Sequence, residues 1–146
     1  MMKKYISLIS IIIIFIFSFS CEEIISEIGC DDCYTPKPDS ADIEVKLSFS
    51  ELNDSIPLTF YRGKIDENVI EWIDTATIGN SPDGIFYLFS QVNKYYSIKA
   101  VYKTKNGKTI TAVDGDKLVR HYNADGCDTE CWTIRGRVLD VRLKYD

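Results

Sequence analysis

Apolar and polar residues alternate along much of residues 43–145, and this pattern predicts β-strands. The segment IEVKLSF at 43–49 places four apolar side chains on one face and three polar side chains on the other. Such alternation is typical of a strand with one buried face. The segments YYSIKAVY (95–102) and LDVRLKY (139–145) repeat it. Further strands are predicted at 57–62, 69–75, 85–90, 109–113 and 131–135.

One hairpin is predicted at KNGK, residues 105–108. Asn-Gly is typical of a two-residue hairpin turn because both positions tolerate positive φ. No window of helical length carries an apolar stripe with a period of 3.6 residues. We therefore expect an all-β domain: a single antiparallel β-sandwich of the immunoglobulin or transthyretin kind, with about seven strands.

The apolar pattern of residues 1–20 is different. Lys3 and Lys4 precede an almost unbroken apolar run from Tyr5 to Phe19. A basic start, a short apolar core and small residues at the end are typical of a secretory signal peptide. The run of 15 residues is shorter than the roughly 20 that a membrane-spanning helix prefers. A retained membrane anchor is the alternative.

Two cleavage sites are compatible with this signal peptide. Ser18-Phe19-Ser20 has the small-x-small form of an ordinary site, which would leave Cys21 as a free N-terminal thiol. In the other interpretation Cys21 is lipidated. The chain has five cysteines, and lipidation of one leaves four that can pair. The segment also resembles bacterial lipoprotein signals, although Ser18 and Phe19 depart from the usual residues. We predict lipidation of Cys21.

The residues after Cys21 suggest a location. The stretch CEEIISE at 21–27 resembles the surface-export signal of Bacteroidota lipoproteins, which places acidic residues just behind the lipidated cysteine. A solvated acidic tether would look the same. The resemblance implies an outer-membrane protein that faces outward. We divide the chain into a signal peptide (1–20), a lipidated acidic tether (21–41) and a β-sandwich domain (42–146).

The net charge restricts the partners. The chain has a net charge of −5, with 17 basic and 22 acidic residues. Removal of residues 1–20 takes away two lysines, so 15 basic and 22 acidic residues remain and the charge becomes −7. Such a surface repels nucleic acid and anionic headgroups. Membrane association is therefore expected from acyl chains, without binding of nucleic acid.

A longer stretch resembles one family. DGIFYLFSQVNKYYSIKAVY at 83–102 is similar to the central repeat of transthyretin-like sandwiches of the carboxypeptidase-regulatory or CnaB type. IPLTFYRG at 56–63 resembles the second strand of that family. The resemblance covers roughly residues 43–113 and implies a fold without catalytic residues. It ends after Gly115, where residues 114–132 are expected to form a long excursion.

Residues that suggest an enzyme are few. His121 is the one histidine, and no serine lies in a recognisable nucleophile elbow beside it. Asp114 and Asp116 could form a pair of catalytic carboxylates, but Asp-Gly-Asp is ordinary turn chemistry. We predict that the protein is not an enzyme and that it has no cofactor.

Metal binding is the alternative to a simple binding module. Asn123, Asp125, Asp128 and Glu130 could offer oxygens to calcium, but they lack the register of an EF-hand loop. Cysteines spaced as Cys-x2-Cys and Cys-x3-Cys could hold zinc. Secretion favours disulfides over zinc because thiols oxidise outside the cytosol. No metal site is therefore assigned.

The four remaining cysteines are Cys30, Cys33, Cys127 and Cys131, and three connectivities are open to them. One has two local bridges, and the other two connect the tether to the segment before the last strands. Cross-bridges close loops of about 95–100 residues, for which chain entropy gives roughly 4–5 kcal/mol. We favour cross-bridges, on the assumption that the first and last strands run side by side and parallel.

Two further kinds of site are predicted. Exposed aromatic residues could stack on a glycan or anchor an envelope protein. Tyr95 is the best candidate because it alternates with the inward Tyr96. Three segments of the form Asp-Ser/Thr-aliphatic resemble Bacteroidota O-glycosylation sites, at Ser40, Ser55 and Thr75. The sequence thus predicts a lipid-anchored, non-enzymatic binding or accessory module at the cell envelope.

Overall fold

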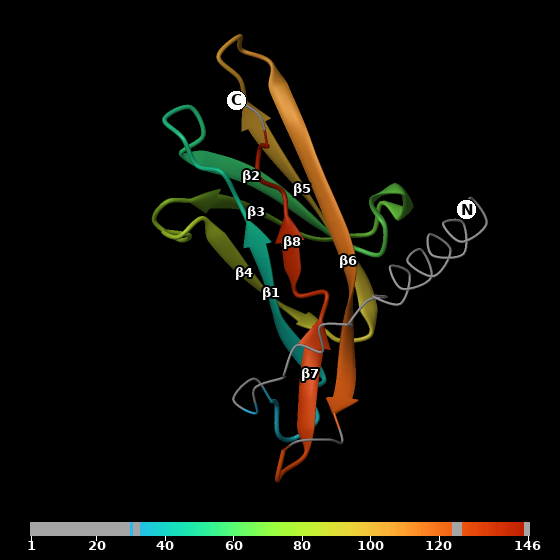
Figure 1. The fold of residues 1–146 in the computed structure, drawn as a ribbon. Coiled ribbons are helices and arrows are strands. Elements are labelled where there is room, and N and C mark those ends of the chain that lie inside the picture. Colours follow the sequence, from blue (N-terminus) through green and yellow to red (C-terminus); the bar gives the residue numbers. More distant parts are fainter. Residues whose placement is uncertain (1–29, 31–32, 124–126, 145–146) are drawn as a thin grey trace, which may run out of the picture.

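The computed structural model describes residues 30, 33–123 and 127–144. They form two β-sheets that pack face to face (Figure 1). The three-stranded sheet has the order β4 (Ile85–Gln91), β1 (Ser40–Lys46), β8 (Val138–Asp140). The five-stranded sheet has the order β3 (Ile70–Thr77), β2 (Ser55–Arg62), β5 (Lys94–Lys103), β6 (Thr109–Asn123), β7 (Cys131–Arg135). The predicted all-β sandwich is confirmed, with eight strands.

The core lies between the two sheets and follows the alternation of the strands. In β5, Ile98, Ala100 and Tyr102 point inward and are completely buried. Ile43 and Val45 of β1 face them from the other sheet. Each such side chain contributes about 1.5–3 kcal/mol by leaving water, which is the main stabilising term of the fold. The 3₁₀ turn η2 (Ile65–Glu67) is the only helical element among residues 33–123 and 127–144.

The ends of the sandwich agree with the predicted arrangement and refine its limits. β1 and β8, the first and last strands, are adjacent and parallel, as expected. β1 begins at Ser40, inside the segment assigned to the tether, and Ala41 is already buried. β8 ends at Asp140, but the backbone N–H of Val141 still donates to Lys46.

The hairpin at 105–108 is confirmed, although its geometry differs from the expected turn. Gly107 has φ of 75°, whereas Asn106 is not in the positive region. The N–H of Gly107 donates to Thr104 O, and the N–H of Thr104 donates to Lys108 O. The turn is therefore longer than a two-residue loop, and only its glycine needs the left-handed conformation.

The largest difference from prediction is the length of β6. The segment expected to leave the fold after Gly115 continues as strand as far as Asn123. Asp-Gly-Asp is not a turn, because Asp114 pairs with Ile98 and Gly115 pairs with Ser97 of β5. A Cβ on Gly115 would lie 2.8 Å from Ser97 Oγ, so this glycine serves close packing between strands.

The extra length of β6 forms a projection with β7, which we call the arm (residues 119–123 and 127–135). These segments pair in antiparallel register from Val119–Arg135 to Asn123–Cys131. Figure 1 shows the arm extending beyond the sandwich. On its outer side, Tyr34 exchanges two backbone hydrogen bonds with Trp132, at 2.8 and 3.3 Å. The arm therefore holds the chain that precedes β1.

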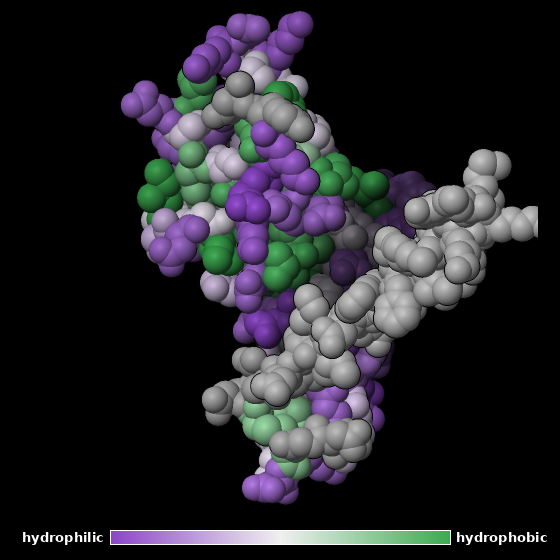
Figure 2. All heavy atoms as spheres, in the orientation of Figure 1, coloured by the Kyte–Doolittle hydropathy of each residue, from purple (hydrophilic) through white to green (hydrophobic). Residues whose placement is uncertain are grey.

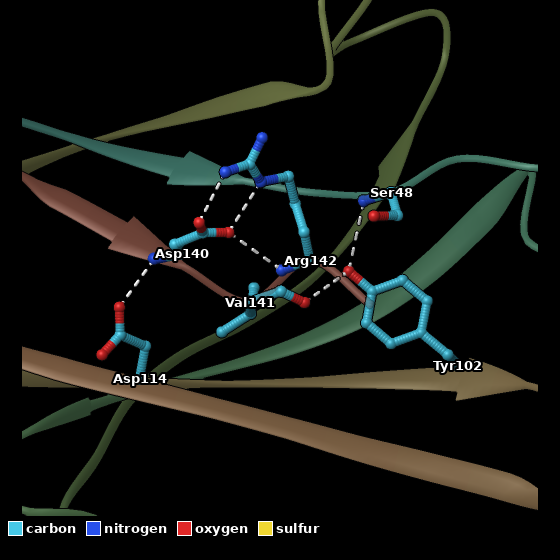
Figure 3. Close-up of polar contacts among 6 residues, drawn as sticks. All are labelled: Ser48, Tyr102, Asp114, Asp140, Val141 and Arg142. Carbon is cyan, nitrogen blue, oxygen red and sulfur yellow. Dashed lines mark hydrogen bonds and ion pairs between the residues drawn. The ribbon is translucent and has the colours of Figure 1, made fainter. Parts of the chain in front are cut away.

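Polar side chains close the sandwich beside β8 (Figure 3). The hydroxyl of Tyr102, on β5, donates to Val141 O at 2.9 Å and accepts from the N–H of Ser48 at 3.4 Å. Asp114 Oδ2, on β6, accepts the N–H of Asp140 at 2.7 Å. These bonds connect the two sheets through the backbone of the last strand.

Among residues 33–123 and 127–144, we find no helix with the length and hydrophobicity needed to cross a bilayer.

Candidate binding surface and tether attachment

Two disulfides connect the chain before β1 to the arm. Cys30 pairs with Cys127, and Cys33 pairs with Cys131. Their Cα atoms are 5.8 and 4.8 Å apart, and the bridges span 97 and 98 positions of sequence. This confirms the predicted cross-bridges and selects one of the connectivities that the sequence left open. Cys21 lies outside the described residues, so its lipidation stays a prediction.

The four cysteines form one compact group. Cys33 Sγ and Cys127 Sγ, which belong to different bridges, are 3.8 Å apart. The sulfurs of Cys33, Cys127 and Cys131 all lie within 4.8 Å of one another. Zinc binds thiolates, so the disulfide form described here does not offer it ligands. The group is a metal candidate only after reduction.

Three of the four residues proposed for calcium lie among the described residues. Asp125 lies outside the described residues. The side-chain amide of Asn123 donates to Thr133 Oγ1 at 3.1 Å, across the two strands of the arm. Asp128 and Glu130 are exposed. The calcium alternative remains untested, and Asn123 has a structural partner instead.

The arm carries its own aromatic group. The rings of Tyr122 and Trp132 lie 4.9 Å apart, with Tyr122 about half exposed. Lys37 Nζ lies 5.0 Å from the Trp132 ring, within reach of a cation–π interaction. The Lys37 contact joins the segment before β1 to the arm, whereas the Tyr122–Trp132 contact lies within the arm. Trp132 therefore serves the attachment of this segment.

The prediction that Tyr95 is the exposed aromatic is wrong. Its side chain is half-buried, and its hydroxyl donates to Gly115 O at 2.9 Å. The N–H of Gly63, in the loop after β2, donates to the backbone carbonyl oxygen of Tyr95. The ring lies over the position where Gly115 has no side chain. The sequence did not reveal this neighbour, because β6 was expected to end before it.

The two most exposed aromatic side chains of the described residues lie on β4 instead. Phe89 is 75% exposed and Tyr87 is 58% exposed, on the outer face of the three-stranded sheet. Their partners on β1 are Asp42 and Glu44. Figure 2 shows hydrophobic residues (green) among hydrophilic ones (purple) on the side of the molecule where β1, β4 and β8 lie. Aromatic rings beside carboxylates are a plausible recognition surface for a polar or cationic partner.

Sequence reasoning missed these two residues for a physical reason. The strand IFYLFSQ has large apolar residues on both faces, with Phe86 and Leu88 facing inward. Hydrophobicity alone therefore does not say which face is buried. The signal that could have decided it is Glu44 on β1, whose partner Tyr87 must share its outward face.

A cleft of about 390 Å³ lies beside β4, where Leu88 and Phe89 line it. Its apolar wall includes Trp72, Leu88 and Tyr96, and Arg62 and Glu71 also line it. Trp72 and Phe86 pack against each other with ring centroids 5.6 Å apart, so the two sheets meet beside the cleft. The cleft thus opens where the edges of the two sheets approach each other.

Another cleft, of about 520 Å³, lies between the loop at 50–53 and the hairpin at 103–106. Leu52, Ile110 and Leu143 line it. It adjoins the end of the described chain at residue 144.

The acidic residues considered for catalysis have structural contacts. Both oxygens of Asp114 accept backbone N–H groups, from Gly115 at 2.8 Å and from Asp140 at 2.7 Å. His121 is on the arm, opposite Thr133. Hydrogen bonds from Arg142 lower the pKa of Asp140 to about 2, and burial raises the pKa of Tyr102. These shifts arise from the contacts that close the sandwich.

The three proposed glycosylation sites are in different settings. Ser55 and Thr75 are exposed on the outer face of the five-stranded sheet, on neighbouring strands. Ser40 is half-buried at the start of β1, opposite Gln91. Ser55 and Thr75 are therefore more accessible to a transferase than Ser40. Their modification stays a prediction.

Comparison with known proteins adds no relative. No family model matches the chain, and no curated protein or solved structure matches it either.

Proposed function

We propose that this chain is a lipid-anchored protein of the cell envelope whose β-sandwich is a non-enzymatic binding module. The observation that carries the proposal is the pair of bridges from Cys30 and Cys33 to the arm. Such bridges persist in oxidising compartments. With four of five cysteines paired, Cys21 is the one left for another use, directly after the predicted signal peptide.

The bridges also support an anchor at Cys21 mechanically. Cys30 follows Cys21 by nine positions and is bonded to the arm. A pull on the acyl chains would therefore act on the arm rather than on β1. This is a suitable arrangement for a domain held at a membrane surface. The resemblance of CEEIISE to surface-export signals supports an outward-facing outer-membrane location.

Two features favour binding over chemistry. Asp114, the best candidate for an acidic catalyst, uses both oxygens to hold backbone N–H groups. Tyr87 and Phe89 expose large rings beside carboxylates on β1, which suits recognition of a partner. An envelope protein or a glycan is the expected class of partner. The resemblance to transthyretin-like sandwiches implies a fold and lends no catalytic residues.

Cell fractionation tests the anchor. Cys21→Ser should move the protein from the membrane fraction to the soluble fraction, because no acyl chain can attach. Cys30→Ser is the matched control: it removes a nearby cysteine but leaves the predicted lipidation site, and it should stay with the membrane. Retention of Cys21→Ser in the membrane fraction would contradict the proposal.

The alternative function is metal binding by the cysteine group. The observation that favours it is the 3.8 Å separation of Cys33 Sγ and Cys127 Sγ. This equals about the sulfur–sulfur distance of a tetrahedral site with Zn–S bonds near 2.3 Å. Protein purified from the host without reductant should contain two disulfides and no zinc. One equivalent of zinc with four thiols would establish the alternative.

A further inference from the structure

Three of the four sheet edges are protected by the chain itself. β8 has only three residues, and the N–H of Asp140 already donates a hydrogen bond to Asp114 Oδ2. At β7, Tyr34 bonds to the backbone of Trp132. Short strands and covered edges are the usual protection against unwanted strand pairing. These two edges are therefore not available to another chain.

The edge of β3 is protected by side chains. The N–H of Thr75 donates to Asp74 Oδ1, and its carbonyl accepts from Asn80 Nδ2. Asn80 Oδ1 also accepts the N–H of Thr77. The β2–β3 pairing has a register shift between Phe60 and Tyr61, which is a further protective irregularity. Thus β3 already uses backbone groups that a new strand would need.

β4 has none of these protections. Within the described part of the chain it pairs with β1 alone, over seven residues without a register shift. The ladder bonds Leu47 N–H to Gly84 O and Val92 N–H to Asp39 O show that even-numbered residues point their backbone groups toward β1. Ile85, Tyr87 and Phe89 therefore direct their N–H and C=O groups to the open side.

A hydrogen bond on this open side agrees with the direction assigned to the backbone groups of β4. The carbonyl of Gln91, which lies on the same side, accepts the hydroxyl of Tyr96 at 3.1 Å. The strand IFYLFSQ contains no lysine, proline or glycine that would discourage pairing. The cleft adjoins this strand, and the exposed rings of Tyr87 and Phe89 lie beside it, with Phe89 also lining the cleft.

We propose that β4 is a docking strand that binds an extended segment of a partner protein by strand addition, and that this segment alternates aliphatic and basic residues. The inference deepens the binding role proposed above and rests on it. Side chains of an added strand alternate between the two faces. The inward set would enter the cleft beside Trp72 and Leu88, which suits aliphatic residues.

The outward set would lie beside Tyr87 and Phe89. Lysine or arginine there gains a cation–π interaction and can reach Asp42, the exposed β1 partner of Phe89. The net charge of −5 favours a basic partner in the same way. A second copy of the chain would instead bring its own acidic residues to this edge. Charge complementarity therefore selects a basic strand of another protein.

The first experiment uses the full-length mature protein in nonionic detergent and a fluorescein-labelled peptide, Lys-Val-Lys-Val-Lys-Val-Lys, with blocked ends. Fluorescence anisotropy should show saturable binding. The peptide Lys-Lys-Val-Val-Lys-Lys-Val has the same composition and charge without the alternation. Its dissociation constant should be at least about tenfold higher. Equal affinity of the two peptides would overturn the proposal.

Backbone methylation tests strand addition without any change to the protein. N-methylation of every second residue removes the donors on one edge of an extended peptide, and methylation of the other residues removes those on the opposite edge. One set should lose at least about tenfold in affinity, and the other should stay within about twofold. If neither set weakens binding, the peptide does not add to a strand and the inference is wrong.

Variants locate the site. Phe89→Pro removes an N–H that faces the open side, a position where proline is tolerated in edge strands. It should weaken binding at least about tenfold, whereas Phe89→Ala keeps the N–H and should lose only the contribution of the ring. Ile73→Ala, an exposed change on β3, is the matched control and should have no effect. Near-ultraviolet circular dichroism checks the fold of each variant.

Other outcomes are distinguishable. Concentration-dependent dimers that Phe89→Pro abolishes would make a second copy the occupant and overturn the basic-peptide assignment. Binding of a soluble glucan oligosaccharide to this face without peptide binding would overturn it in favour of a glycan. Failure of every peptide to bind would overturn the docking inference. Release of Cys21→Ser from membranes in the same study would leave the proposed anchor intact. Peptide binding with Cys21→Ser retained would reject the anchor alone.

Discussion

The sandwich and the arm share strand β6 but are held together by different means. From its start to Leu118, which is completely buried, β6 packs against the common core. Beyond it, the strand pairs with β7, and Cys131 is the one completely buried residue of β7. That residue belongs to a disulfide. The sandwich is thus stabilised by apolar burial, and the arm is stabilised by covalent bridges.

The difference shows how a small domain can extend a strand past its own core. A two-stranded ribbon alone is marginal in water. Here the bridges and the Tyr34–Trp132 pairing fasten a third segment to it. This segment is the one that leads back to Cys21. The arm therefore fixes where the chain leaves the domain, while the edge of β4 stays accessible on the sandwich.

The largest effect is expected when both bridges are removed together. Replacement of all four cysteines by serine should lower the free energy of unfolding by about 4–5 kcal/mol, because a loop of nearly 100 residues is no longer closed. Removal of one bridge alone, as in Cys30→Ser with Cys127→Ser, should cost less than about 2 kcal/mol, since Cys33–Cys131 still closes almost the same loop. Urea unfolding measures both.

The contrast between the single and the double removal is the informative result. If each single removal cost about half of the combined effect, the bridges would act independently, and the shared-loop explanation would be wrong. Hydrogen exchange on the same samples should show early exchange in β7 and continued protection in β5.

A smaller effect is expected from truncation in the core. Leu139→Ala removes a completely buried side chain of β8 and should cost about 2–5 kcal/mol. Val119→Ala is the matched change on the arm, where the side chain is only half-buried, and should cost less than about 1 kcal/mol. Thermal unfolding followed by circular dichroism gives both values. Equal losses would mean that the arm has a core of its own.

A single hydroxyl should matter next. Tyr102→Phe keeps the ring in the core but removes the donor to Val141 O, leaving a buried carbonyl without that partner. We expect a cost of about 1–2 kcal/mol. Faster amide exchange at Ser48, whose N–H donates to the same hydroxyl, would locate the effect at the closure of the sandwich. Unchanged exchange at Ser48 would show that this bond contributes little.

The smallest effect concerns acid pH. Arg142 donates to both oxygens of Asp140 and lowers its pKa from 3.8 to about 2. A carboxyl with a lowered pKa in the folded state stabilises the protein above pH 4. That contribution is lost as the pH falls from about 4 to 2. The side chain of Asp140 is 31% exposed and that of Arg142 is 52% exposed. Solvent screening therefore limits the effect to less than about 1 kcal/mol.

The variant Arg142→Ala isolates this contribution from the other carboxyl groups. Its stability should fall less than that of the unmodified protein between pH 4 and pH 2. Parallel pH profiles of the two proteins would show that the ion pair does not influence stability.

Local patterns predicted the strands because each strand depends mainly on its own alternation. Ile43 and Val45 of β1 and Ile98 of β5 are buried as their positions indicated. The cysteine pairing followed from the parallel arrangement of β1 and β8, a long-range contact that had to be assumed. Asp-Gly-Asp at 114–116 was interpreted as a turn, because a glycine needed for packing between strands looks the same in sequence as one in a turn.

The candidate surface could not be predicted to the same extent. Tyr95 alternates with Tyr96, but its ring lies against Gly115 of the neighbouring strand and its hydroxyl donates to Gly115 O. Phe89 is exposed, although its own strand gives no polar alternation to show it. The protection of the β8 edge depends on side chains from another strand, such as Asp114 of β6. These contacts exist only once the sheets are assembled.

We propose that the disulfide-bonded arm connects the sandwich to a lipid anchor at Cys21. Mass spectrometry of the protein from bacterial membranes, digested without reduction, tests this directly. We expect an N-terminal peptide that begins with acylated Cys21, together with the peptides linked through Cys30–Cys127 and Cys33–Cys131. An N-terminal peptide that retains residues before Cys21, or one with a free Cys21 thiol, would contradict it.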